Sequence, residues 1–348
     1  MILSNNDWDP LKECFVGIAD NMVHPKMDLS VMSFSYAGYD YEEVKDLKGA
    51  YPQWIIDEAN EDLDNLSLQL EKLNVKVRRP EKTKHSDTFS SPDWQSTGWY
   101  NYCPRDLLLP LDNLIIDCPS AMRSRYFETF AYRKFLYEQF DEGVLWISAP
   151  KPRLLDDLYT FEDLTKPTVL DKEIIFDAAN IVRMGNDLLF QVSNSGTIKG
   201  AKWLESIVKP LGYRVHIADG FYAYTHFDST VIPLRPGLVL FNGARLNENH
   251  YPKIFKKWDK IFFDDVIDIG SSLPNGISPC SPYIGLNLLS ISEELVIVDI
   301  NQTSLRKKLS SYGIESIGLN MRHARTISGG FHCVTLDTLR DGKREDYF

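Results

Sequence analysis

The stretch NIVRMGNDLLF, residues 180–190, contains two short apolar runs that are separated by a polar turn with a glycine. Apolar runs of this length on either side of such a turn are typical of a β-hairpin. The same order of a polar residue, a strand, a turn and a second strand recurs elsewhere in the chain. The further copies lie at 106–116, 228–240 and 287–297, and a weaker fifth copy lies at 9–18.

Helical periodicity separates several of these hairpins. Apolar residues spaced three and four apart, from Ile56 to Leu73, predict a helix that ends near Asn74. Glycines that follow two later helices, Gly212 and Gly313, are typical stop signals. Further helices are predicted at 123–140, 199–208 and 303–312, and strands at 75–78, 213–215 and 315–317.

A hairpin, a helix and a short strand form a module that cannot bury its own apolar faces, so such modules must pack around a common centre. No Gly/Ser-rich or Pro-rich linker divides the chain. We therefore predict one closed α/β domain over residues 1–348. Two stretches without a clear pattern, 20–51 and 150–172, are predicted to be surface insertions, and loops of this length often shape a substrate pocket.

The composition is that of an ordinary globular protein, with 43% hydrophobic residues and a formal net charge of -11. This charge argues against nucleic acid or an anionic membrane as a partner, because both attract a basic surface. A small cationic substrate suits it better. Residues 1–7 lack the features of a secretory signal, and no apolar run approaches the about 18 residues of a membrane-spanning helix.

The cysteines are widely spaced and form no CxxC pair. Such spacing is unlike a disulfide framework or a structural zinc site and favours a reducing cytoplasm. The sequence contains no phosphate-binding loop, dinucleotide-binding fingerprint, GxSxG or HExxH motif. We therefore predict a cytoplasmic protein that needs no metal and no cofactor. The cysteines are Cys14, Cys103, Cys118, Cys280 and Cys333.

Unusual polar residues collect at the hairpin openings. Asp106 stands at the first opening and Asp177 at the second, while His226 and Asp228 stand at the third. Taken singly, an aspartate here is more often a turn or cap residue, and a lone histidine is usually structural. Strand alternation, however, places His226 and Asp228 on one face, which is costly for buried polar groups without a function. If the modules surround an axis, these residues share one site.

The stretch GGFHC, residues 329–333, presents a cysteine after two glycines and a histidine. Glycines permit close backbone approach to a ligand, and a nearby imidazole can activate a thiol. A buried, unreactive cysteine in a glycine turn is the alternative. His332 is predicted to point away from the site, because neighbouring residues of a strand face opposite sides. The imidazole that serves Cys333 is then His226.

A thiol, a histidine and several carboxylates suit nucleophilic attack on an electron-poor carbon that is held between anions. A guanidinium group meets that description, because carboxylates bind its planar cation while a thiolate attacks the central carbon. The candidate residues therefore predict chemistry on a guanidino compound.

Three motifs, FDAAN at 176–180, THFDST at 225–230 and GGFHC at 329–333, resemble in sequence and order those of the L-arginine amidinotransferases. The resemblance implies the fold of the guanidine-modifying enzymes, a five-bladed pseudo-symmetric α/β propeller built of ββαβ modules. It also implies a homodimer, the common state of family members. Further matching stretches are 102–106, 122–125 and 149–152, and the resemblance runs from about Trp8 to Phe348.

The resemblance implies a role for each candidate residue. Cys333 is the nucleophile, His226 is the general acid and base, and Asp177 orients the histidine. The residues that bind the donor are Asp106 and Asp228, which hold its guanidinium group, Arg245, which pairs with its carboxylate, and Ser281, which lies beside the site.

The implied reaction is a ping-pong transfer. Cys333 takes the amidino group of L-arginine, ornithine leaves, and a small amine acceptor then receives the group. Two other functions remain possible for the same residues. One is a guanidine hydrolase of the same fold, such as a deiminase, and the other is a relative that binds guanidines without catalysis.

Stretches at 7–11, 36–38, 49–52 and 280–287 are similar to the inosamine-phosphate amidinotransferases of bacterial secondary metabolism. Thr225 departs from the bulkier residue of glycine-specific enzymes, which leaves room for a larger amine. The resemblance thus implies an aminocyclitol acceptor such as scyllo-inosamine phosphate, in antibiotic biosynthesis. The alternative acceptors are an amine intermediate of a guanidinium toxin of the saxitoxin type, lysine and glycine.

Overall fold

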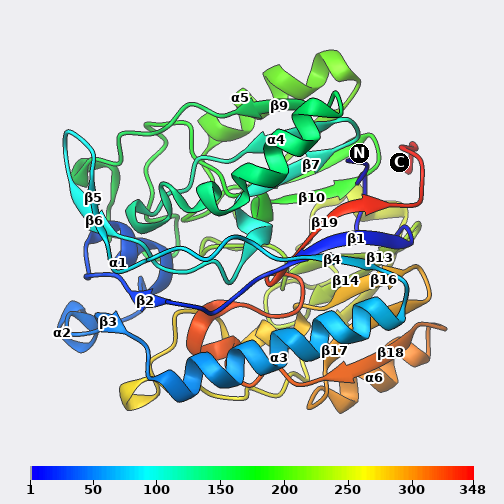
Figure 1. Ribbon diagram of the computed structural model, residues 1–348. Coiled ribbons are helices and arrows are strands. Elements are labelled where there is room, and N and C mark those ends of the chain that lie inside the picture. The colour runs from blue at the N-terminus through cyan, green and yellow to red at the C-terminus, as the bar shows by residue number, and fades with distance from the viewer. Residues whose placement is uncertain (1) are drawn as a thin grey trace.

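The computed structural model describes residues 2–348 and has an α/β fold whose strands form small sheets (Figure 1). Within the described residues, five sheets have three strands each. In each of the five, a central strand pairs antiparallel with one neighbour and parallel with the other. This is the pairing that a hairpin followed by a helix and a strand produces.

Four of the five sheets use consecutive strands, and each begins at one of the four stronger predicted hairpins. These hairpins are confirmed. The sheets are β7 (Leu108–Leu111), β8 (Leu114–Asp117) and β9 (Leu145–Ser148); β10 (Ile181–Met184), β11 (Asp187–Gln191) and β12 (Arg214–Ala218); β13 (Val231–Arg235), β14 (Leu238–Asn242) and β15 (Asp259–Phe263); and β16 (Leu289–Ser292), β17 (Leu295–Asp299) and β18 (Glu315–Leu319).

The fifth sheet joins the two ends of the chain. Its central strand, β1 (Leu11–Val16), pairs antiparallel with β19 (Thr335–Arg340) and parallel with β4 (Lys76–Arg78). The prediction of a hairpin at 9–18 is therefore wrong, because the strand that completes this pair comes from the other end of the sequence. The pairing places Cys333 just before the first strand of a sheet, as Asp106 and Asp177 are placed in theirs.

Helices connect the second and third strands in four of the sheets. The helices predicted before Asn74, at 199–208 and at 303–312 are confirmed. A 3-10 turn at Lys253–Lys257 takes the same place between β14 and β15. The connecting helices are α3 (Gln53–Lys72), α4 (Arg133–Asp141), α5 (Ile198–Val208) and α6 (Thr303–Ser310).

The single helix predicted at 123–140 is wrong. This stretch forms two 3-10 turns, Arg123–Arg125 and Glu128–Tyr132, before α4 begins. Phe127, which a regular helix would place on one face with the buried Ala131 and Phe135, is 37% exposed. The side chains of Arg125 and Glu128 turn inward instead and bind each other, with Arg125 Nε 2.6 Å from Glu128 Oε2. The chain therefore forms two 3-10 turns with a buried ion pair here, in place of a regular helix.

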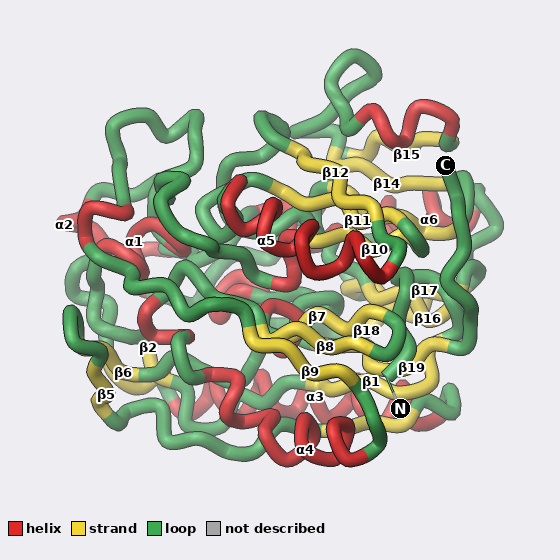
Figure 2. The backbone as a smooth tube through the Cα atoms, turned by 90° about the horizontal axis from the view of Figure 1, so that it is seen from above, coloured by secondary structure: helices red, strands yellow, loops and turns green. Residues whose placement is uncertain are grey.

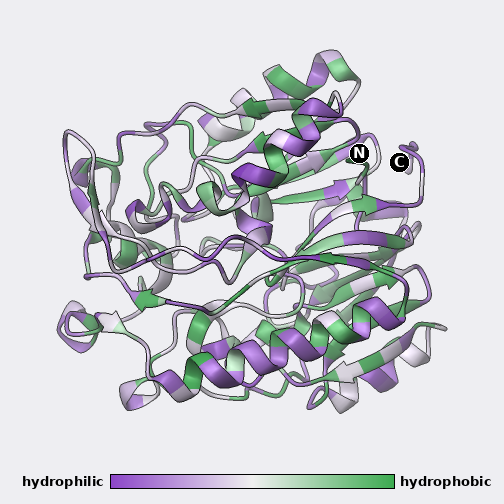
Figure 3. Cartoon of the chain, in the orientation of Figure 1, coloured by the Kyte–Doolittle hydropathy of each residue, from purple (hydrophilic) through white to green (hydrophobic). Residues whose placement is uncertain are grey.

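Apolar strand residues hold adjacent sheets together. Leu111 and Ile116 of one sheet share a core cluster with Leu188 and Phe190 of the next, and Leu240 of the third sheet lies in one cluster with Val296 of the fourth. Strands buried on both faces need such near-continuous apolar runs. Figure 3 shows this as mostly green strands, while the outward face of α3 carries much purple.

The stretch 20–51 was predicted to be a surface insertion, and this is only partly right. It forms β2 (Val23–His24), α1 (Leu29–Ser35), α2 (Tyr41–Val44) and β3 (Gly49–Ala50). Val31, Phe34 and Tyr36 are buried in the largest core cluster. Figures 1 and 2 place these elements, with β5 (Thr88–Ser90) and β6 (Gln95–Thr97), at the end of the molecule opposite most of the sheets. Among residues 2–348, no helix combines the length and the apolar character needed to cross a bilayer.

Candidate active site

The hairpin openings converge on one cavity, as the sequence predicts. Asp106 ends a 3-10 turn that leads into β7, His226 and Asp228 lie in the loop before β13, and Cys333 precedes β19. All four line an inner cavity of about 40 Å³. The fifth member of the predicted set, Asp177, is fully buried behind the cavity and reaches it through His226.

His226 lies between two carboxylates. Its Nε2 is 2.9 Å from Asp177 Oδ2 and its Nδ1 is 3.4 Å from Asp106 Oδ1. Burial alone disfavours an imidazolium, but the charge of Asp106 and the hydrogen bond to Asp177 outweigh burial and raise the pKa of His226 to about 9. His226 is therefore a proton donor at neutral pH, with an orientation fixed by Asp177.

Cys333 is held by its backbone and its thiol. Its amide N donates to Asn287 Oδ1 at 3.0 Å, and its Sγ donates to Asp228 Oδ2 at 3.2 Å. A hydrogen bond with Cys103, burial and the charge of Asp228 raise the pKa of the Cys333 thiol well above its ordinary value. The resting cysteine is thus a thiol, and a cation must approach before it becomes a nucleophile.

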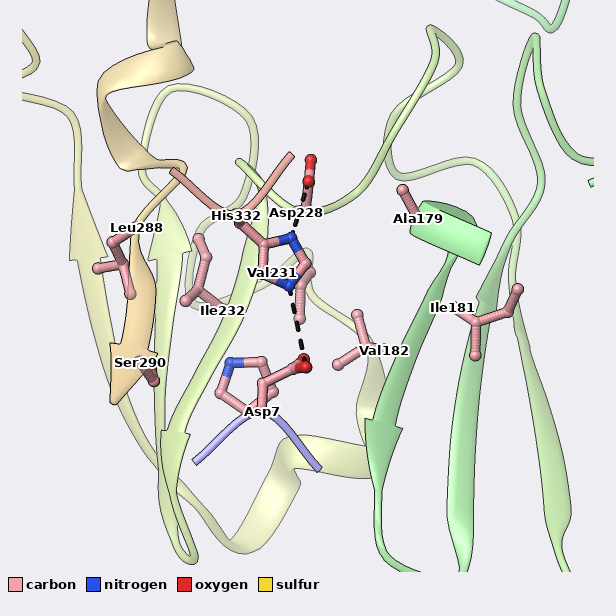
Figure 4. Close-up of a pocket in the computed structure, with 11 residues that line it drawn as sticks. Asp7, Ala179, Ile181, Val182, Asp228, Val231, Ile232, Leu288, Ser290 and His332 are labelled. Atoms are coloured by element: carbon pink, nitrogen blue, oxygen red, sulfur yellow. Dashed lines mark hydrogen bonds and ion pairs between the residues drawn. The ribbon is translucent and has the colours of Figure 1, made fainter. Parts of the chain in front are cut away.

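The prediction for His332 is only partly right: its side chain lies outside the inner cavity and lines a separate one, but it contacts the site through Asp228. Figure 4 shows its ring between Asp228 and Asp7. Nδ1 is 2.9 Å from Asp228 Oδ2 and Nε2 is 3.8 Å from Asp7 Oδ1. Strand alternation does not apply here, because Cys333 and His332 lie in a turn and β19 starts only at Thr335.

Asp106 is anchored from behind by a buried ion cluster. Arg125 Nη1 donates to Asp106 Oδ2 at 2.6 Å, and the same guanidinium makes two bonds to Glu128. Asp106 Oδ1 is buried and has no hydrogen-bond partner in the described part of the chain. Its ion pair with His226 at 3.4 Å is no substitute for a hydrogen bond, whose absence is costly on the wall of a cavity, and a bound cationic donor would supply one.

Arg245 and Ser281 lie at the outer side of this cavity. Arg245 Nη2 donates to Ser281 Oγ at 2.5 Å, and its guanidinium stacks 3.7 Å from the centroid of the Tyr222 ring. No carboxylate of residues 2–348 lies within ion-pair distance of Arg245. An unpaired, mostly buried guanidinium of this kind suits the carboxylate of a ligand.

Sequence reasoning missed three residues that hold the site together. Asn287 fixes the backbone of Cys333, Arg125 holds Asp106, and Cys103 contacts the thiol of Cys333. Asn287 could have been found, because it opens the fourth predicted hairpin just as Asp106 opens the first. Residues 2–348 contain no group of three or more His, Cys, Asp or Glu side chains arranged to hold a metal ion.

No protein-family model matches the sequence. The inosamine-phosphate amidinotransferase 1 of Streptomyces griseus, in contrast, is 45% identical over 349 residues, which cover 100% of this chain and 99% of the relative. The solved structure of an inosamine-phosphate amidinotransferase from the same organism superposes with a TM-score of 0.96 at 44% identity and covers 100% of this chain and 99% of that one.

Two further relatives show how wide this likeness is. An amidinotransferase of the saxitoxin biosynthetic pathway from Microseira wollei superposes with a TM-score of 0.89 at 34% identity, covering 100% of this chain and 99% of that one. The L-arginine:L-lysine amidinotransferase of Pseudomonas savastanoi pv. phaseolicola is 36% identical over 99% of this chain and 96% of the relative. Together with the site geometry, these likenesses show that the chain belongs to the amidinotransferase family of transferases.

Proposed function

We propose that this enzyme moves the amidino group of L-arginine through a covalent amidino-cysteine at Cys333 to an amine acceptor, and releases ornithine. The observation that carries the proposal is one small cavity lined by the thiol of Cys333, the imidazole of His226 and the carboxylates of Asp106 and Asp228. These groups supply a nucleophile, a proton donor and two anions for one guanidinium.

Donor binding uses opposite charges at the two ends of arginine. Asp106 Oδ1, which within the described residues makes an ion pair with His226 at 3.4 Å but no hydrogen bond, and Asp228 accept hydrogen bonds from the guanidinium. Arg245, supported by Ser281, receives the carboxylate of the donor. The electron-poor carbon of the guanidinium then lies beside the sulfur of Cys333, which Asp228 contacts at 3.2 Å.

Besides Cys103 and burial, the charges of Asp228 and Asp106 raise the pKa of Cys333, and the bound guanidinium offsets these charges, so the thiol proton leaves toward solvent by way of Asp228. The thiolate attacks the central carbon. His226, protonated because its pKa is about 9, gives its proton to the leaving nitrogen. Ornithine departs as the amine, the amidino group stays on sulfur as a thiouronium cation, and His226 is left neutral.

The second half-reaction runs these steps in reverse with a new amine. The acceptor attacks the amidino carbon, neutral His226 removes one proton from the attacking nitrogen, and the thiolate of Cys333 leaves. The product is a guanidinium compound, and His226 is again protonated. Water in place of the acceptor would release urea from the amidino-cysteine and waste the amidino group, so the narrow inner cavity favours transfer over hydrolysis.

The acceptor we favour is an aminocyclitol such as scyllo-inosamine phosphate. The similarity over the whole chain to an inosamine-phosphate amidinotransferase supports it, as does the small Thr225 on the cavity wall. An amine intermediate of a guanidinium toxin, lysine and glycine are the alternatives. We further infer that the five three-stranded sheets are the blades of one pseudo-symmetric propeller, that residues 1–348 form a single catalytic domain, and that the enzyme is a cytoplasmic homodimer.

The test is incubation with L-arginine and hydroxylamine, a small uncharged acceptor. We expect ornithine to be released, and we expect mass spectrometry after arginine alone to find an amidino adduct on Cys333. The Cys333→Ser variant should bind arginine without turnover. Citrulline formation without an amine would instead indicate a hydrolase, and arginine binding with neither adduct nor ornithine would indicate a non-catalytic guanidine-binding protein.

A further inference from the structure

The inner cavity opens onto a larger outer cavity of about 420 Å³. The two share wall residues, among them Phe34, Thr225, Cys280 and Ser281. An acceptor that reaches the amidino group on Cys333 therefore has its far end in the outer cavity. The chemistry of that wall determines which acceptors fit.

The two cavities carry opposite charges. Asp106 and Asp228 line the inner cavity. The charged residues on the outer wall, within the described chain, are both cations, Arg245 and Arg325. In a protein of net charge -11 this is a local reversal of sign, and a site that concentrates cations selects a ligand with negative charge.

Arg325 is only partly used by the protein. Its Nε donates to Asp268 Oδ1 at 2.8 Å, and its Nη1 donates to the carbonyl of Cys280. Its Nη2 makes no hydrogen bond to any described residue. The Asp268 side chain is 41% exposed, so water screens its charge. On the same wall, the hydroxyl of Tyr39 accepts a bond from the Ser278 amide at 3.1 Å and keeps its own proton to donate.

We propose that Arg325 and Tyr39 form an anion-binding subsite that holds a phosphate group of the acceptor amine. The proposal rests on the amidinotransferase function proposed above. L-Arginine has one carboxylate, and Arg245 suffices for it, so the donor leaves Arg325 without an anion. A phosphorylated acceptor supplies a dianion for Arg325, on the same cavity wall as Arg245, whereas lysine or glycine brings one carboxylate that Arg245 can bind alone.

The experiment compares two acceptors in the Arg325→Gln variant: scyllo-inosamine phosphate and unphosphorylated scyllo-inosamine. Loss of a charged hydrogen bond should lower kcat/KM for the phosphorylated amine about 10- to 100-fold, through KM. Turnover of arginine with unphosphorylated scyllo-inosamine, or with hydroxylamine as a further acceptor, should stay unchanged, because neither amine carries an anion. Arg153→Gln is the matched control, because Arg153 also pairs with an aspartate but is exposed and outside both cavities.

A second variant should strengthen anion binding at Arg325 rather than weaken it. Asp268→Asn removes the anion that competes for Arg325, and inorganic phosphate should then inhibit acceptor turnover more strongly than in the wild type. Equal kcat/KM of Arg325→Gln and wild type on the phosphorylated amine would overturn the subsite. An equal loss with hydroxylamine would also overturn it, since Arg325 would then act only through the Cys280 carbonyl. Absence of ornithine from the wild type is a separate outcome, which refutes the proposed function instead.

Discussion

His332 Nδ1 lies 2.9 Å from Asp228 Oδ2, the same oxygen that accepts the thiol of Cys333. Burial raises the pKa of a carboxyl group, but the hydrogen bond and charge of His332 reverse this and bring the pKa of Asp228 to about 2. His332 therefore positions Asp228 and keeps it ionised. An anion at this place is required both to bind a guanidinium and to receive the thiol proton.

The His332→Gln variant tests this positioning role. The amide of Gln reaches the place of Nε2 rather than that of Nδ1, so Asp228 loses the hydrogen bond from His332 and its pKa rises. Because arginine binding needs the ionised carboxylate, the acid limb of kcat/KM for arginine should move to higher pH. His332→Asn, whose amide nitrogen matches Nδ1, should restore much of the wild-type profile. Identical pH profiles for both variants and the wild type would show that His332 only fills space.

Cys103 should control the reactivity of Cys333. The hydrogen bond between the two thiols is the largest cause of the raised pKa of Cys333, so Cys103→Ala should lower that pKa. Alkylation of Cys333 by iodoacetamide, followed by mass spectrometry across pH, should then begin at lower pH. Cys118→Ala is the control, because Cys118 is buried away from the inner cavity. An unshifted alkylation profile in Cys103→Ala would contradict the role of this contact.

The predictable part of the fold is the part encoded locally. The hairpin at 180–190 follows from two apolar runs and a turn, and both strands form as expected. The pairing of β1 with β19 was missed because it joins residues from opposite ends of the chain, such as Val16 and Thr335. The broken helix at 123–140 was missed because the tertiary pair of Arg125 and Glu128 overrides helical spacing.

The site could be predicted to a similar extent. Asp106, His226 and Cys333 could be singled out because each precedes a strand that is recognisable from the local sequence. All three line the inner cavity, so they do converge. The contact of His332 with Asp228 was missed for a local reason: the bond from Thr335 N to the His332 carbonyl at 3.2 Å belongs to a turn, where alternation of side chains does not hold. Of the two outer cations, Arg245 was predicted through the family resemblance, whereas Arg325 was missed because it lies in no recognisable motif and only the fold brings it to the cavity.

Asp177 should set the working pH of His226. The first half-reaction needs His226 as an imidazolium. The rate of amidino-adduct formation should therefore fall as pH rises through about 9, where His226 loses its proton. Asp177→Asn removes an interaction that raises this pKa, so the base limb of the adduct-formation rate should move to lower pH. The rate should also fall by roughly 100- to 10,000-fold, as expected for impaired acid and base catalysis.

The control for this change is Asp187→Asn. Asp187 Oδ1 lies 2.6 Å from His216 Nε2, so it forms the same kind of pair outside the inner cavity. The control should leave the pH dependence of ornithine release unchanged. Rapid-quench measurement of the first turnover separates adduct formation from acceptor transfer. A base limb that stays in place in Asp177→Asn would mean that Asp177 does not govern the proton on His226.

Arg125 should be essential for stability rather than for substrate contact. Its buried guanidinium satisfies two buried carboxylates, Asp106 at 2.6 Å and Glu128 at 2.6 Å. Arg125→Met would leave Glu128 without its cation and Asp106 with His226 alone, and breaking a buried pair in this way costs about 3–5 kcal/mol. Urea denaturation should show that loss in the free energy of unfolding. Glu128→Gln is the milder comparison, because burial already raises the pKa of Glu128 to about 7, so a neutral side chain there costs less. If Arg125→Met were as stable as Glu128→Gln, the charge of Arg125 would not be what holds Asp106 at the cavity wall.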